Sequence, residues 1–215
     1  MDGLIGIDVA SARAQIQELG EIGYNAYKSL DEAGRTFFED LSTKWASPNA
    51  VAFCDTYARS LELAFNAFRE KFYHVVHGAN DAGRTLAKVH GDLWVDVGFP
   101  GEGVGSSSVG YCCCKENING ISGMAVENVK TICYSFRAAI QNAVASVYYL
   151  PTSIQFVSPD GSLVSEYAIN IKSIVDEMGE TLDPLSSAIW TYIETETDNI
   201  LLAKNEAENI LKSNA

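Results

Sequence analysis

Residues 45–49, Trp-Ala-Ser-Pro-Asn, and residues 156–160, Phe-Val-Ser-Pro-Asp, decide the fold of this 215-residue chain. Both stretches join an aromatic residue to Ser-Pro across one small or apolar residue, and Tyr-Ala follows each of them, at residues 57–58 and 167–168. Proline disfavours helix in the residue before it and suits the first turn of a new helix. The chain therefore contains an internal repeat, and each copy predicts a reversal between two helices.

Apolar and small residues recur at steps of three and four on both sides of the first stretch. They run from Ile5 to Leu41 before it and from Tyr57 to Val89 after it. Residues at this spacing share one face of a helix. Residues 1–90 therefore predict a helical hairpin, although Gly78 and Gly83 each lower helix stability.

The same periodicity returns in the second half of the chain. It covers residues 125–150 and, after the second Ser-Pro, runs from Leu163 to Ile210. Pro184 is expected to kink or break this last helix because proline removes a backbone hydrogen bond. Residues 124–215 thus predict a second helical hairpin with an extended C-terminal helix.

Residues 91–123 have a different character, with many glycines and three consecutive serines at residues 106–108. We interpret them as a connector. Trp94 and Phe99 are apolar, so part of the connector should pack on the helices. One hairpin cannot bury its apolar stripe alone, whereas two stacked hairpins can. The expected fold is all-α: a pseudo-symmetric antiparallel four-helix bundle, equivalent to a dimer of hairpins within one chain.

Charge and hydropathy limit the possible partners. The net charge is −13, which leaves no basic surface for nucleic acid or for anionic lipid headgroups. No apolar run approaches the ~20 residues that cross a bilayer. The N-terminal residues lack a basic region followed by a long apolar run. The chain is expected to be made in the cytoplasm without a Sec signal peptide.

Five cysteines, three of them consecutive at residues 112–114, do not resemble the disulfide framework of a small secreted domain. Reduced thiols are the expectation. A zinc site at Cys112, Cys113 and Cys114 would need a second pair of ligands elsewhere. Cys133 lies in an apolar helical stretch, which favours a buried structural thiol over a nucleophile. We expect no metal, no cofactor and no catalytic residue, so the chain is predicted not to be an enzyme.

With its repeated turn, the chain resembles the Trp-x-Gly (WXG) helical-hairpin proteins of bacterial type VII secretion. Trp45-Ala46-Ser47 stands at the place of Trp-x-Gly with serine for glycine, and residues 156–158 form a second copy without tryptophan. The resemblance implies hairpins that pair into four-helix bundles. It also implies a Tyr-x-x-x-Asp/Glu export signal, which Tyr192 and Glu196 match near the C-terminus.

The resemblance thus implies a secreted substrate, or a carrier that delivers an effector. Its partner would be a secretion ATPase or a co-secreted effector protein. The candidate recognition residues are Trp45, Ser47 and Pro48 at the turn, with Tyr192 and Glu196 as the signal. Tyr27 and Asp31 have the same spacing, but only Tyr192 lies late in the last helix. In antiparallel packing the turn of one hairpin lies near the open end of the other, which would bring Trp45 and Tyr192 into one surface patch. Trp45 is also expected to plug the end of the hairpin, a role compatible with recognition.

The sequence leaves two other hypotheses for the function open. The connector around Trp94 and Phe99 would insert in a bilayer if the protein were a membrane-active helical bundle. The cysteine triplet would bind a metal or react if the chain were a metal carrier or an enzyme. The sequence also leaves open whether the chain oligomerises further.

Overall fold

The computed structural model describes residues 7–107, 109, 114–148, 154–157, 163–167 and 171–213, and the chain within them is mostly helical. The elements, in chain order, are α1 (Val9–Lys44), β1 (Trp45–Ala46), α2 (Pro48–His90), β2 (Gly123–Met124), α3 (Val126–Tyr148), β3 (Ile154–Val157), β4 (Leu163–Tyr167) and α4 (Ile171–Ser213).

Local sequence sets the ends of the first two helices. Asp8 caps α1, because its carboxylate accepts a hydrogen bond from the Ser11 N–H at 2.9 Å. Ser47 caps α2 in the same way by accepting from the Ala50 N–H at 3.0 Å, and Pro48 occupies the first turn. Gly91 ends α2 in a left-handed conformation with φ 76°.

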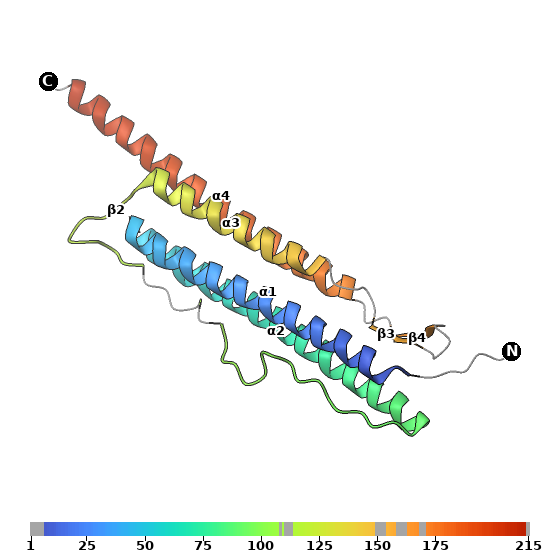
Figure 1. Cartoon of the computed structure of the whole chain (residues 1–215). Coiled ribbons are helices and arrows are strands. Elements are labelled where there is room, and N and C mark those ends of the chain that lie inside the picture. Colours follow the sequence, from blue (N-terminus) through green and yellow to red (C-terminus); the bar gives the residue numbers. More distant parts are fainter. Residues whose placement is uncertain are drawn as a thin grey trace.

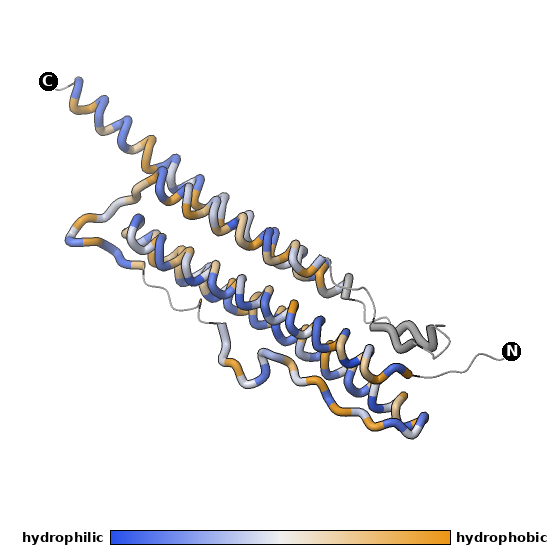
Figure 2. The backbone as a smooth tube through the Cα atoms, in the orientation of Figure 1, coloured by the Kyte–Doolittle hydropathy of each residue, from blue (hydrophilic) through white to orange (hydrophobic). Residues whose placement is uncertain are grey.

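The four helices share one apolar core. Helix α1 packs against α2 and α3, and α4 packs against α3 and α2, so each helix has two helical neighbours (Figure 1). Aromatic rings join the elements across this core: Phe37 of α1 stacks on Phe136 of α3 with ring centroids 4.4 Å apart. Polar and apolar residues alternate along each helix in Figure 2, as in helices that bury one face.

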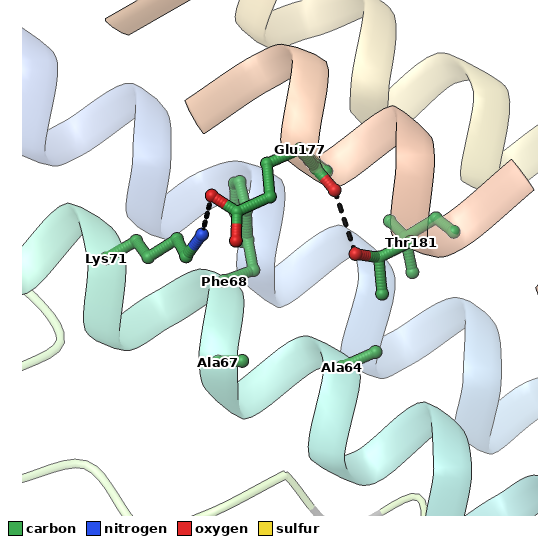
Figure 3. Close-up of a pocket in the computed structure, with 8 residues that line it drawn as sticks. Ala64, Ala67, Phe68, Lys71, Glu177 and Thr181 are labelled. Atoms are coloured by element: carbon green, nitrogen blue, oxygen red, sulfur yellow. Dashed lines mark hydrogen bonds and ion pairs between the residues drawn. The ribbon is translucent and has the colours of Figure 1, made fainter. Parts of the chain in front are cut away.

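Polar side chains contact one another where α2 packs against α4. Lys71 of α2 forms an ion pair with Glu177 of α4, and the Thr181 hydroxyl donates to the Glu177 carbonyl oxygen at 2.8 Å (Figure 3). Phe68 and Met178 border the same place, where a hollow of about 60 Å³ remains. Because small-molecule sites usually enclose several hundred Å³, this hollow is a packing gap.

The connector follows the α1 and α2 pair back to β2 (Figure 1). Asn80, a buried residue of α2, holds it through two hydrogen bonds of 2.8 Å, one to the Val97 carbonyl oxygen and one from the Val97 N–H. Trp94 lies against Gly83, where a side chain of any size would overlap the indole ring. Phe99 is buried in the core. The prediction that part of the connector packs on the helices is confirmed.

One expectation for the second half is wrong, and the expectation that Pro184 kinks or breaks the last helix is wrong as regards the break. Residues Leu163–Tyr167 form strand β4, which pairs antiparallel with β3, whereas the sequence predicted the start of the last helix there. The step of four residues from Leu163 to Tyr167 suits a helix, but Val and Tyr in the same segment also favour a strand. Pro184 does not break α4, which continues from Ile171 to Ser213. Pro184 and Glu180 are exposed, so water can reach the carbonyl group that loses its hydrogen bond.

Substitution of two helical glycines should have opposite effects on stability. A methyl group at Gly23 would overlap the Phe72 ring across the α1 and α2 contact, whereas a methyl group at Gly78 would meet nothing within 4 Å. We expect Gly23→Ala to lower the free energy of unfolding by about 1–3 kcal/mol through overpacking. Gly78→Ala should raise it by up to about 1 kcal/mol through helix propensity. Chemical denaturation followed by circular dichroism measures both, and equal effects would contradict the close approach at Gly23.

Candidate functional site

The turn between α1 and α2 is held in place by the end of the connector. Trp45 and Ala46 form β1 and pair antiparallel with Met124 and Gly123 of β2. The Ala125 N–H donates to the Lys44 carbonyl oxygen at 2.8 Å, which satisfies one of the last carbonyl groups of α1. The first turn of α3 therefore lies beside the turn that precedes α2.

Four aromatic rings meet at this turn. Phe53 of α2 is central, with its ring centroid 5.4 Å from Trp45, 4.8 Å from Tyr57 and 5.2 Å from Tyr192 of α4. Trp45 and Tyr192 are 6.4 Å apart, within the range of aromatic pairs. The structure thus brings together the aromatic residues that the sequence singled out, across 147 residues of chain.

A hydrogen bond joins the carboxylate of the predicted signal to the same turn. The Asn49 amide, one residue after Pro48, donates to Glu196 Oε1. An open groove of about 680 Å³ runs beside this contact between α2 and α4. Its walls include Tyr57, Tyr192 and Glu196. The groove therefore has aromatic side chains along its wall and the Glu196 carboxylate at its edge. An open groove of this kind suits the binding of a protein segment.

Burial raises the pKa of Tyr192 above 10, and the nearby Glu196 carboxylate and Tyr57 raise it further. The phenol is therefore neutral at physiological pH and keeps its proton as a hydrogen-bond donor. Among Tyr57, Tyr192 and Glu196, it is Glu196 that gives the site its negative charge.

The predicted site residues do not all lie on the surface. Trp45 is 1% exposed, so its ring closes the end of the hairpin, and the prediction of an exposed patch is wrong for this residue. The Ser47 side chain is a helix cap, and Pro48 is exposed. Tyr192 and Glu196 are half-buried at the edge of the groove. Trp190 faces away from this site and packs on Tyr134 with ring centroids 4.4 Å apart.

Sequence reasoning missed Asn49, Phe53 and Tyr57 as parts of the site. Tyr57 was interpreted as part of the packing stripe of the second helix, and Asn49 and Phe53 as parts of the repeated turn motif. Asn49 gave a usable signal, because an amide directly after Ser-Pro lies on the exposed first turn of α2, where it can bind an acidic side chain of a neighbouring helix.

Directly behind the turn, Cys54 of α2 forms a disulfide with Cys114 of the connector, with their Cα atoms 6.6 Å apart. The expectation of reduced thiols is wrong for this pair. Spacing along the sequence gave no sign of it, because the two residues meet only when the connector returns to the turn. Cys112 and Cys113 lie outside the described residues. Burial raises the pKa of Cys133 to about 12, so this free thiol is not ionised at neutral pH.

Within the part of the chain that the structure describes, no group of three or more histidine, cysteine, aspartate or glutamate side chains is placed to hold a metal ion. None of the described helices is both long and apolar enough to cross a membrane. Comparison of the chain with protein-family models, with curated proteins and with solved structures found no match.

Proposed function

We propose that this protein is a non-enzymatic substrate or carrier of a bacterial type VII secretion system, built as two WXG-like hairpins in one chain. In this proposal Ser47 and Pro48 of the hairpin turn and the signal residues Tyr192 and Glu196 form one composite recognition site, and the buried Trp45 ring holds the turn against Tyr192. A secretion ATPase or a co-secreted effector would bind it. The chemistry is recognition between proteins.

The arrangement of the helices supports the tandem-hairpin part of the proposal. Each helix packs on two others, and the first turn of α3 lies beside the turn between α1 and α2. This is the packing expected of a pseudo-symmetric antiparallel four-helix bundle. The β3 and β4 hairpin takes the place of the second helical turn, so the two halves differ most at that end.

The observation that carries the functional proposal is the contact between Asn49 and Glu196 together with that between Trp45 and Tyr192. Either motif alone is too short to be specific. Their meeting in space adds specificity, because it requires residues 192–196 of α4 to pack against the turn that precedes α2. A partner that read both would discriminate the folded protein from an unfolded chain that carries the same tyrosine and glutamate.

The Cys54–Cys114 disulfide supports a final location outside the reducing cytosol. Disulfides persist in oxidising compartments and are rare where thiols are kept reduced. The bond also fastens the connector behind the composite site, at a position next to Phe53.

Export of the tagged chain from a bacterium with a type VII ATPase tests the proposal. The wild-type protein should appear in the culture medium, and deletion of the ATPase should abolish this. Tyr192→Ala combined with Glu196→Ala should reduce export at least tenfold because both contacts of the signal are lost. Glu196→Gln keeps an acceptor for Asn49 and removes the charge, so it separates the two contributions of the glutamate.

Tyr27→Phe combined with Asp31→Asn is the matched control. It alters the other tyrosine and acid pair with the same spacing, far from the turn, and export should persist as long as the variant folds. If abundant, folded wild-type protein stayed inside in every strain, the secretion proposal would fall. If both double variants failed equally, the composite site would not be the signal.

A further inference from the structure

The C-terminal part of α4 projects beyond the other helices (Figure 1). All side chains from Leu201 to Ser213 are exposed, although this segment is helical throughout. Most of the stability of a helix in a protein comes from packing of its apolar face, so a projecting helical end with an exposed apolar face calls for a partner.

The apolar face of this segment continues the face that α4 buries in the core. Ile189 and Ile193 are fully buried, and steps of three and four residues lead from them to Ile200, Ala203, Ala207 and Leu211. Leu211 is 72% exposed. Figure 2 shows apolar residues among polar ones along the projecting end. The apolar stripe of α4 therefore continues beyond the part of the helix that α2 and α3 cover.

The order of residues along this stripe is self-complementary. Large residues stand at its two ends, Ile200 and Leu211, and alanines stand between them. If a second helix of the same sequence runs antiparallel, Ile200 of each copy faces Leu211 of the other. The alanines then meet in the middle and allow the two backbones to approach closely.

Charge selects the antiparallel direction. Lys204 and Glu208 lie next to each other along one edge of the stripe, with Nζ and Oε1 3.8 Å apart. Antiparallel pairing in this register brings Lys204 of one copy to the level of Glu208 of the other, twice by symmetry. In a parallel pair the two-fold axis would run along the helices and place this edge of the two copies on opposite sides of the contact, so these charges would not meet.

We propose that residues 200–211 of α4 form an antiparallel contact with the same residues of a second copy, so that the chain is a homodimer joined at its projecting helices. The contact lies at the low end of specific interface sizes, so the dimer is weak and depends on concentration. This inference is independent of the secretion proposal, because it uses only the projecting helix.

Sedimentation of the full-length protein over a range of concentrations tests the contact. Wild-type protein should pass from monomer to dimer. Leu211→Asp, on the stripe, should prevent this, whereas Leu202→Asp, on the opposite face, should leave it unchanged. Circular dichroism checks that both variants keep their helix, and a non-reducing gel excludes dimers joined by disulfides. Wild-type protein that stays monomeric at every concentration, or equal effects of the two leucine variants, would overturn the proposal.

Charge reversal tests the direction of pairing. Lys204→Glu alone and Glu208→Lys alone should each raise the dimer dissociation constant on the order of tenfold, since both cross-helix pairs become repulsive. An equimolar mixture of the two variants should restore dimerisation, which the pair within one helix cannot explain. The doubly reversed chain should dimerise with itself and not with wild-type protein. Equal dimerisation of the doubly reversed chain with itself and with wild-type protein would show that these charges do not meet, and would overturn the arrangement.

Discussion

Reduction of the Cys54–Cys114 disulfide is expected to lower the free energy of unfolding by about 4 kcal/mol. The two cysteines are separated by 60 residues. In the chain-entropy model, closing a loop of this size restricts the unfolded chain by about that amount. Denaturant titration of the oxidised protein and of the protein in a thiol reductant measures the difference directly.

The Cys114→Ser variant provides the control for this prediction. Cys114 is only half-buried, so its replacement removes the bond with little change to the core, whereas Cys54 is fully buried. The variant should match reduced wild-type protein and should not respond to the reductant. Peptide mapping under non-reducing conditions should recover a peptide pair that contains Cys54 and Cys114. Pairing of Cys54 with Cys112 or Cys113 instead would contradict the assignment.

Trp45→Ala should destabilise the protein by about 3–5 kcal/mol, the usual effect of removing a fully buried tryptophan. The ring is 1% exposed and contacts Phe53 and Tyr192, so its loss leaves a cavity where the turn meets α4. Thermal or chemical unfolding measures this effect. A change below about 1 kcal/mol would mean that the ring does not close the core.

Trp45→Phe separates packing from recognition at the same position. It keeps an apolar ring beside Phe53 and should lose less stability than Trp45→Ala. If Trp45 acts only by packing, the folded Trp45→Phe protein should be exported like the wild type. A selective loss of export with stability retained would show that the indole ring positions Tyr192 for recognition.

The helical part of the fold could be predicted from the sequence, because the spacing of apolar residues over more than thirty positions leaves few alternatives. The turn at Trp45 was predictable too, since Ser47 and Pro48 are strong signals for the start of a helix. The contact between Trp45 and Tyr192 followed from antiparallel geometry alone and is present in the structure.

The remaining features depend on contacts between residues that are far apart in the sequence, and no local pattern of residues indicates such contacts. Residues 163–167 combine a spacing that suits a helix with residue types that favour a strand, and the pairing with β3 decides between them. The partner of Cys54 is set by the path of the connector, which Asn80 and Gly83 fix through contacts that their positions in a helical stripe do not reveal. The burial of Trp45 depends on how closely β2 and α4 approach the turn.

The bond between Cys54 and Cys114 also closes residues 54–114 into a covalent ring. A pore that admits one extended strand could draw the oxidised chain in from its C-terminus only as far as Cys114. There the next segment would enter as two strands side by side, and passage would stop. The oxidised protein therefore crosses such a barrier only through an opening that admits two strands at once, whereas the reduced chain can be threaded from end to end.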